Sequence, residues 1–496
     1  MDGLESFKKV SGLMVSTHKS MIFFCNTNAR TKAAILQRVL FREGTLPVTY
    51  LGMPLITKRL SRTDCAPLVE RLMARASSWI STALSLAGRL QLVKATLVSM
   101  QFYWCSAFLL PSSIAKECDR ILRKFLWGGQ GQGKVKWTEV CKPMAEGGLG
   151  IKDFKTWNRA LFLKQVWDIV INQSLWARWC HVYLIKQANF WCLPSNGLHS
   201  WSWRQILLLR PLAKEHLIYK SGRGDKFSLW FDPWMHGESV HTLYGHSVIH
   251  DSLLGRLALV KEVIKEGMWD WPAFSSDLVD IQLTVQDIPI SFTLDSIYWV
   301  DLGCSFSTKL ACQSIRDRSA EVGWHRLVWH PARIPKHAFC LWLAMRRAHR
   351  TRDELLAWGV INSASCVFNC GEVESLEHLF FHCPFSHYIW RAVLSMCNIL
   401  RPISQWSDEV QWMLVHARGH KFPALVRKLA FAASVYHIWL ERNRRCFKNE
   451  FMHAQEIIDR IKHDVASKLW LGRKTQRCEW HHSLCENWGI PLGEKT

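Results

Sequence analysis

The stretch CVFNCGEVESLEHLFFHC occupies residues 366–383 and brings three cysteines and two histidines into one short segment. Four of these side chains follow the spacing Cys366-x3-Cys370-x7-His378-x4-Cys383. Zinc takes four tetrahedral ligands from thiolate and imidazole, and two short ligand pairs let a chain enclose the ion. Four protein ligands leave no open coordination position. The spacing therefore predicts a structural zinc site, which holds a fold together and does not activate water.

Two alternatives to this assignment exist within the stretch. His382 could replace His378, but residues 377–381 are typical of a helix start that would direct His378 back toward the cysteine turn. The four side chains could also be small buried thiols and a surface histidine with no metal between them.

A second grouping of ligand-type residues lies near the end of the sequence. It reads Cys478-x2-His481-His482-x2-Cys485. Chance explains it as well as metal binding does, because the sequence is rich in both residue types and nothing around the grouping predicts a zinc fold.

Composition and length indicate a folded protein. The sequence has 496 residues, of which 49% are hydrophobic and 21% charged, and it contains 27 Trp. Such a chain is long enough for roughly three or four compact units. Its 17 cysteines are an odd number without framework spacing, so reduced thiols with one metal site are favoured over a disulfide scaffold.

The charge balance favours a phosphate-bearing partner. Lys and Arg total 63 against 41 Asp and Glu, a formal net charge of +22. This is the electrostatic pattern of a protein that binds RNA or DNA. No lipidation motif accompanies the basic segments, and the uncharged run at 95–115 contains Gln101 and Pro111, so we expect no membrane association. The N-terminal residues do not form a secretory signal, which favours an intracellular location, nucleus or cytoplasm. Oligomeric state is not predicted.

Hydrophobic periodicity favours a mostly helical α+β fold. Residues 1–60 show short apolar runs between turn signals, and residues 61 to about 168 have helical spacing. A Trp-rich region at about 175–300, with turn signals at 222–225 and at Pro233, is compatible with short strands and loops and shows no catalytic constellation. Helical spacing returns near Phe306 and again in a last segment at about 424–471.

Individual helix faces can be assigned from the same periodicity. One helix has the apolar face Leu68, Leu72, Ala76 and Trp79, and another has Ile114, Cys118, Ile121 and Phe125. A third presents Phe339, Trp342 and Leu343, with Arg346, Arg347 and Arg350 expected on its opposite side. The basic residues beside these faces could also be ordinary solvated surface.

The residues around the zinc stretch closely resemble the zinc-binding module that follows the reverse transcriptase of plant LINE-type, non-LTR retrotransposons. The resemblance rests on Cys370-Gly371-Glu372, on residues 377–381 and on Cys383-Pro384-Phe385. It departs from that family at the first cysteine pair, which has two intervening residues there and three here, residues 367–369.

The resemblance extends over most of the sequence. Further segments that carry it are 11–13 with 19–20, 50–55, Trp79, 88–89, Pro111, 125–128, 147–150 and 226–234. It implies a palm-end and primer-grip-like remnant at 1–60, a helical thumb-like domain at 61–175, a Trp-rich connector at 176–300, the zinc-binding domain at 305–395 and a C-terminal helical region at 396–496.

By this resemblance the thumb would grip template and primer through phosphate contacts, which are largely independent of sequence. The candidate contacts are Arg71, Arg75, Arg89, Lys94, Arg123 and Lys124 in the thumb-like helices and Arg346, Arg347 and Arg350 beside the zinc module.

The family's polymerase carries an Asp-Asp motif before the position that matches Ser11. No Asp-Asp dipeptide occurs in this sequence, and nucleotide addition needs two divalent metals bridged by carboxylates. We therefore expect a catalytically incomplete fragment of an RNA-directed DNA polymerase that retains nucleic-acid binding and is not an enzyme on its own. Asp408, Glu409 and Asp459 do not provide the clustered carboxylates of a ribonuclease H. The alternatives are an incomplete gene model of a full-length active reverse transcriptase and a zinc-dependent protein interaction module.

Overall fold

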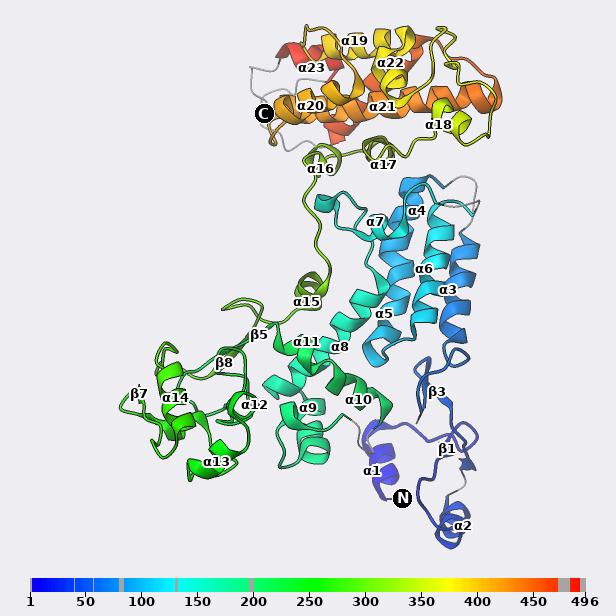
Figure 1. The fold of residues 1–496 in the computed structure, drawn as a ribbon. Coiled ribbons are helices and arrows are strands. Elements are labelled where there is room, and N and C mark those ends of the chain that lie inside the picture. The colour runs from blue at the N-terminus through cyan, green and yellow to red at the C-terminus, as the bar shows by residue number, and fades with distance from the viewer. Residues whose placement is uncertain are drawn as a thin grey trace, which may run out of the picture. The chain divides into compact units, whose positions relative to one another are not determined.

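The structure is a computed structural model that describes residues 2–39, 41–56, 58–79, 84–129, 133–195, 200–471 and 482–490. The chain divides into two compact units, which are described separately. Unit 1 comprises residues 1–68, 103–114 and 158–315, and unit 2 comprises residues 69–102, 115–157 and 316–496. Helices predominate and the strands form short two-stranded sheets, which confirms the predicted mostly helical α+β class (Figure 1).

Unit 1 begins with small elements that bury little surface. None of the described residues before Leu60 is buried, so these residues form no core among themselves. Its elements are α1 (Asp2–Ser11), β1 (Met21–Ile22), α2 (Ala29–Arg38), β2 (Arg42–Glu43), β3 (Val48–Tyr50) and β4 (Met53–Leu55). β1 pairs with β2 in parallel, and β3 pairs with β4 antiparallel.

The remainder of unit 1 forms two hydrophobic cores. One includes Phe162, Trp203 and Trp299, and the other is built around Trp230 and Trp234. The elements are α8 (Phe154–Ile171), α9 (Leu175–Cys180), η3 (His181–Ile185), η4 (Phe190–Cys192), α10 (Trp201–Leu208), α11 (Arg210–Lys214), β5 (Leu217–Lys220), α12 (Val240–Tyr244), α13 (Ser247–Asp251), η5 (Val260–Val263), β6 (Ile264–Lys265), β7 (Met268–Trp269), α14 (Ser276–Thr284), β8 (Ser296–Trp299) and α15 (Thr308–Ile315).

The Trp-rich region contains more helix than its turn signals predicted. The serines Ser174, Ser200, Ser239 and Ser275 each cap the N-terminus of a short helix through a side-chain hydrogen bond. Serine before an apolar segment is a helix-start signal, and it could have identified these helices. The predicted turn at 222–225 is present. The Asp295 carboxylate closes it by accepting hydrogen bonds from the backbone N–H groups of Gly222, Gly224 and Lys226 at 2.7–2.9 Å.

Unit 2 is mostly helical. Its elements, with those that cross a unit boundary, are α3 (Ala66–Ser78), α4 (Leu86–Leu92), η1 (Val93–Leu97), α5 (Val98–Ala107), α6 (Ser112–Leu126), α7 (Trp137–Cys141), η2 (Met144–Glu146), α16 (His325–Val328), α17 (Pro335–Met345), α18 (Arg352–Ala357), η6 (His378–His382), α19 (Pro384–Met396), α20 (Trp406–His416), α21 (Phe422–Lys448), α22 (Ala454–Leu471) and α23 (His482–Trp488).

The apolar faces predicted for α3 and α6 are confirmed. Leu68, Leu72 and Ala76 are buried on α3, and Trp79, just beyond its end, is half-buried with its ring 6.3 Å from that of Phe125 on α6. The last predicted segment, 424–471, is in fact two helices. Asn449 ends α21 in the left-handed conformation, with φ at 53°, and α22 begins at Ala454. Among the described residues no helix is long and apolar enough to cross a bilayer.

Candidate metal centre

The first cysteine pair lies on a short hairpin. Ser365 and Val373 form an antiparallel bridge, and the backbone N–H of Cys366 donates to the carbonyl of Glu372 at 2.8 Å. Asn369 has a φ of 57°, in the left-handed region that asparagine tolerates better than most residues. This residue turns the chain back, so that the hairpin accommodates three residues between the cysteines.

The second ligand pair flanks a π-helical turn. His378 begins η6, and the backbone N–H of Cys383 donates to the carbonyl of His378 at 2.8 Å. This i to i+5 bond brings the two ligand positions onto one side of the turn, and such π turns are frequent at functional sites. His378 is buried, whereas His382 is exposed. Of the two alternatives, the structure places His378 beside the cysteines.

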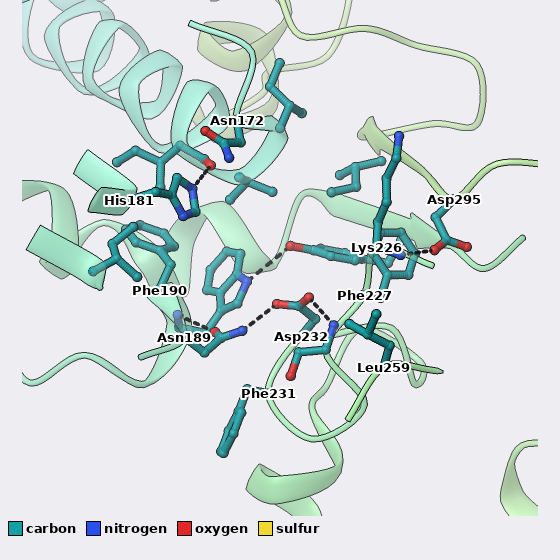
Figure 2. Close-up of a pocket in the computed structure, with 18 of the residues that line it drawn as sticks. Asn172, His181, Asn189, Phe190, Lys226, Phe227, Phe231, Asp232, Leu259 and Asp295 are labelled. Carbon is teal, nitrogen blue, oxygen red and sulfur yellow. Dashed lines mark hydrogen bonds between the residues drawn. The ribbon is translucent and has the colours of Figure 1, made fainter. Parts of the chain in front are cut away.

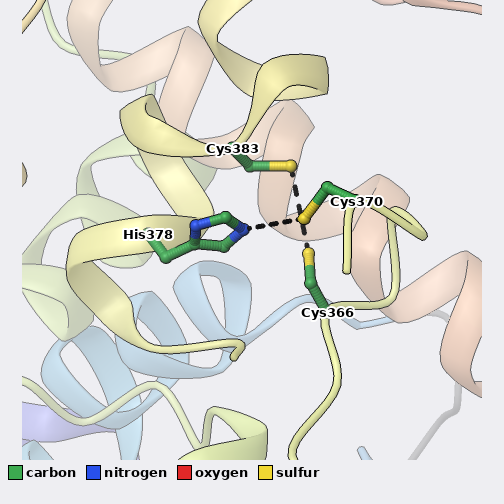
Figure 3. Close-up of side chains that lie close together, drawn as sticks. All are labelled: Cys366, Cys370, His378 and Cys383. Atoms are coloured by element: carbon green, nitrogen blue, oxygen red, sulfur yellow. Dashed lines mark hydrogen bonds between the residues drawn. The ribbon is translucent and has the colours of Figure 1, made fainter. Parts of the chain in front are cut away.

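The four side chains Cys366, Cys370, His378 and Cys383 converge, with their ligand atoms all within 4.8 Å of one another (Figure 3). The Sγ of Cys370 lies 3.1 Å from Nε2 of His378, and the Sγ atoms of Cys366 and Cys383 are 3.9 Å apart. Tetrahedral zinc with ordinary Zn–S and Zn–N bonds separates its ligand atoms by about 3.5–3.8 Å. The donor set and its spacing therefore fit one zinc ion. The hydrogen bond between the Cys366 and Cys383 thiols lowers the pKa of Cys383 and raises that of Cys366.

A buried ion pair anchors the hairpin to α21. Glu374 is fully buried, and its Oε1 accepts from Nε and Nη2 of Arg442 at 3.0 and 2.8 Å and from the backbone N–H of Arg352 at 3.1 Å. The sequence gives no signal for this pair, because the partners belong to segments far apart along the chain.

An aromatic cluster lies beneath η6. Phe381 stacks on Trp406 with centroids 5.7 Å apart and packs on Phe431 at 5.6 Å, and Trp390 lies 5.7 Å from Phe431. These rings come from η6, α19, α20 and α21. The turn η6, which begins with His378, therefore shares one core with the C-terminal helices within unit 2.

The glycine segment 147–150 joins α17 to the region around α7. The carbonyl of Gly147 accepts from Nε1 of Trp342 and from Nε of Arg346, both at 2.9 Å. Arg346 also lies 3.1 Å from a carboxylate oxygen of Glu139. The chain around Gly147 and Glu139 therefore contacts the C-terminal end of α17. All residues of this helix from His337 to Ala344 are buried.

The expectation that Arg346, Arg347 and Arg350 lie on the opposite side of this helix from its apolar face is therefore wrong. The helix ends at Met345, and the three arginines follow in the next loop. Arg346 is engaged with Gly147 and Glu139. Arg347 pairs with Glu377 at 2.8 Å, and Arg350 lies over the Trp358 ring.

The candidate contacts of the thumb-like helices fall into two groups. Four are exposed, namely Arg71 and Arg75 on α3 and Arg123 and Lys124 on α6. The other two, Arg89 on α4 and Lys94 in η1, are half-buried. Burial and the nearby charge of Arg333 lower the pKa of Lys94 to about 8. Among the described residues no carboxylate makes a hydrogen bond or ion pair with Lys94, which is unusual for a half-buried cation.

A pocket with a volume of about 920 Å³ lies in unit 1 (Figure 2). Its polar groups mostly bind one another. Asp232 accepts from Asn189 at 2.9 Å and from the backbone of Ser228 at 2.7 Å, and Trp191 donates to the hydroxyl of Tyr219 at 3.1 Å. Burial raises the pKa of both Asp232 and Tyr219. These hydrogen-bonded groups stabilise the fold of unit 1.

Glu409, a buried carboxylate after residue 390, has a structural role. Glu409 is fully buried and accepts from Nε1 of Trp390 at 2.8 Å and from Arg401 at 2.7 Å. It is therefore not available to hold a catalytic metal.

Comparison with known proteins adds two kinds of finding. Residues 306–390 match the family described as zinc-binding in reverse transcriptase, and this range contains the four converging side chains. A protein of Arabidopsis thaliana named "putative ribonuclease H protein" is 30% identical over 364 residues, which are 69% of this chain and 58% of that protein. An uncharacterized mitochondrial protein of the same plant is 25% identical over 148 residues, which are 29% of this chain and 96% of that protein.

The chain thus carries a segment, residues 306–390, that matches the zinc-binding domain of reverse transcriptases. Together with the similarity to the ribonuclease H-named protein, this match supports a relation to reverse-transcriptase-type retroelement proteins. The chain spans less than two thirds of the length of the ribonuclease H-named relative.

Proposed function

We propose that the chain is a nucleic-acid-binding part of a non-LTR retrotransposon reverse transcriptase, and that it binds RNA or DNA without polymerising nucleotides itself. The observation that carries the proposal is Lys94, which is half-buried near the charge of Arg333 and forms no ion pair with a carboxylate in the part of the chain that the structure describes. A cation in this setting has lost hydration that a phosphate oxygen could replace. Exposed cations on α3 and α6 of the same unit would extend the contact along a phosphate backbone.

In this proposal the zinc centre has a structural role. Cys366, Cys370, His378 and Cys383 would hold one zinc ion, which supplies cross-linking between the hairpin and η6 and offers no open position for a substrate. Through the shared aromatic core and the buried pair of Glu374 with Arg442, the same centre orients α21 and the loop after α17.

The proposal that this chain does not polymerise rests on its carboxylates. The sequence contains no Asp-Asp dipeptide, and among the described residues the groups able to hold a metal contain at most one carboxylate each. Two catalytic metals require more acidic ligands than one such group supplies.

The test is binding of the purified chain to single-stranded RNA, single-stranded DNA and duplex DNA across a salt series, together with a primer-extension assay. We expect binding at low salt that weakens steeply as salt rises, and no extension. Absence of binding at low salt, or binding indifferent to salt, would overturn the nucleic-acid role. A protein partner that stays bound after nuclease treatment, with no nucleic-acid affinity, would favour an interaction module instead.

A further inference from the structure

A second group of metal-ligand side chains lies away from the zinc-binding cysteines. His337 on α17, His437 on α21 and Asp464 on α22 converge within unit 2, with one ligand atom from each within 4.8 Å of the others. The Nε2 atoms of His337 and His437 both lie 3.1 Å from Oδ2 of Asp464. The three positions are distant in sequence, so no motif reveals them.

His337 is the most deeply buried of the three side chains. This side chain is only 1% exposed, and neither of its ring nitrogens has an aligned hydrogen-bond partner among the described residues. Burying polar groups without partners is unfavourable. The nearby oxygen of Asp464 already accepts a hydrogen bond from His437 at 3.1 Å. A cation between the three ligand atoms would satisfy Nε2 of His337 and the carboxylate together.

The distances fit a transition metal. Zinc bonds to imidazole nitrogen and carboxylate oxygen are about 2.0–2.2 Å long, which places tetrahedral ligand atoms about 3.3 Å apart. The 3.1 Å separations in this cluster are close to that value. Two imidazoles and one carboxylate form a borderline ligand set, which suits zinc and similar divalent ions better than calcium or magnesium.

We propose that His337, His437 and Asp464 form a second divalent metal site, separate from the cysteine site and of different ligand type. A cleft of about 430 Å³ that includes His437 and Asp464 in its lining leads to it, bordered also by Lys336, Tyr436 and Arg460. Three protein ligands leave a fourth position on a zinc ion, and the cleft gives this position access to water.

Lys336 provides the competing explanation. Its Nζ lies 3.3 Å from Oδ2 of Asp464, so a lysine and two histidines could neutralise the carboxylate without a metal. The Lys336 side chain is 43% exposed and can swing into solvent when a metal binds. Lys336→Met therefore separates the two explanations. If a metal binds, the variant removes a cation that competes for Asp464 and should raise metal affinity. If the ion pairs are purely internal, the variant removes one of them and should lower stability.

The experiment uses the full chain, equilibrated with buffered zinc and then analysed for zinc per chain. We expect Asp464→Asn and His437→Gln each to lower the zinc content by one, while His416→Gln, at an exposed histidine on α20, leaves it unchanged. Cobalt distinguishes the two sites. When cobalt replaces zinc, charge-transfer absorption from thiolate to cobalt should persist in Asp464→Asn and His437→Gln, because both variants keep all the ligands of the cysteine site. Lys336→Met should bind the second metal several-fold more tightly than the wild-type chain.

The proposal is overturned if Asp464→Asn and His437→Gln hold as much zinc as the wild-type chain. It is also overturned if Lys336→Met lowers thermal stability without raising metal affinity. Circular dichroism of each variant establishes that lost metal does not reflect an unfolded chain. If a cluster variant fails to fold, the Lys336→Met result and the wild-type zinc content still decide between the explanations, because one zinc per wild-type chain excludes a second site.

Discussion

Lys94 is a cation that the fold holds at a cost in stability. Its pKa of about 8, lowered by burial and by Arg333, lies below the value of 10.5 usual for a lysine. Between these two values the unfolded chain binds more protons than the folded chain, so the free energy of unfolding rises with pH across this window. Below about pH 8, Lys94 is protonated in the folded chain, and the full free-energy cost of holding its charged ammonium group half-buried is present. A residue with such a penalty is a candidate for function.

We expect Lys94→Met to leave stability at pH 7 unchanged or raised by on the order of 1–2 kcal/mol, and to remove the rise in stability between about pH 8 and 10. The same variant should weaken RNA binding several-fold, because a phosphate contact is lost. Denaturant unfolding at several pH values and binding titrations measure the two effects. Lys220→Met, at an exposed lysine of unit 1, is the control. A destabilised variant with unaltered affinity would show that Lys94 is structural.

The two glutamate-arginine pairs near the zinc centre should differ greatly in their contribution to stability. Glu374→Gln leaves the buried guanidinium of Arg442 without its counter-ion and should lower the free energy of unfolding by about 3–5 kcal/mol. Glu377→Gln breaks a pair whose arginine, Arg347, is 65% exposed, and should lower it by less than about 1 kcal/mol. Denaturant unfolding of both variants makes the comparison. Equal losses would contradict the anchoring role of the buried pair.

At the scale of helices and turns, the sequence predicted what depends on local spacing. The three cysteines and the histidine lie close together along the chain, so their spacing could predict the grouping that the structure brings together. The apolar stripes on α3 and α6 each follow from the periodicity of one helix. The burial of α17 on all sides could not be predicted, because the covering bonds come from Gly147 and Glu139 far away in sequence. The same reason hid His337, His437 and Asp464, which meet only after three helices have packed.

Removing zinc should loosen the elements that the ion joins. We expect Cys370→Ser to lower the zinc content by one and to speed amide exchange at Cys366 and Glu374, whose N–H groups close the hairpin. Stability should fall by at least about 2 kcal/mol, because the hairpin and η6 lose their cross-link. Cys446→Ser, at an exposed thiol on α21, should change neither. Retention of all zinc in the first variant would refute the ligand assignment.

The glycine segment at 147–150 should tolerate no side chain at its second position. A Cβ on Gly148 would lie 2.0 Å from the carbonyl oxygen of Lys142, which belongs to the backbone and cannot move aside cheaply. We expect Gly148→Ala to lower the free energy of unfolding by about 2–3 kcal/mol. Gly323→Ala, whose Cβ would meet nothing within 4 Å, should be close to neutral. Thermal unfolding of both variants tests whether close backbone approach explains this glycine.

At the scale of the whole molecule, net charge indicates the kind of partner, whereas the position and burial of each cation indicate whether it can contact that partner. A charge of +22 predicts affinity for a polyanion, but many cations here are already engaged. Arg316, Arg401 and Arg442 neutralise buried glutamates, and their loss would damage the fold before it affected binding. The resemblance to retroelement proteins therefore had to be combined with burial before the candidate contacts could be separated into structural and available cations.

Four available cations, Arg71, Arg75, Arg123 and Lys124, lie exposed on α3 and α6. If they contact phosphates, replacing all four by Ala should reduce the slope of log affinity against log salt by about 3 for single-stranded RNA, since each contact contributes about 0.7. Replacing the exposed lysines Lys186, Lys220, Lys265 and Lys309 of unit 1 removes the same formal charge and should leave the slope nearly unchanged. An equal reduction of the salt slope in both variants would mean that net charge alone governs binding. A specific binding surface requires that the position of the cations matter as well as their charge.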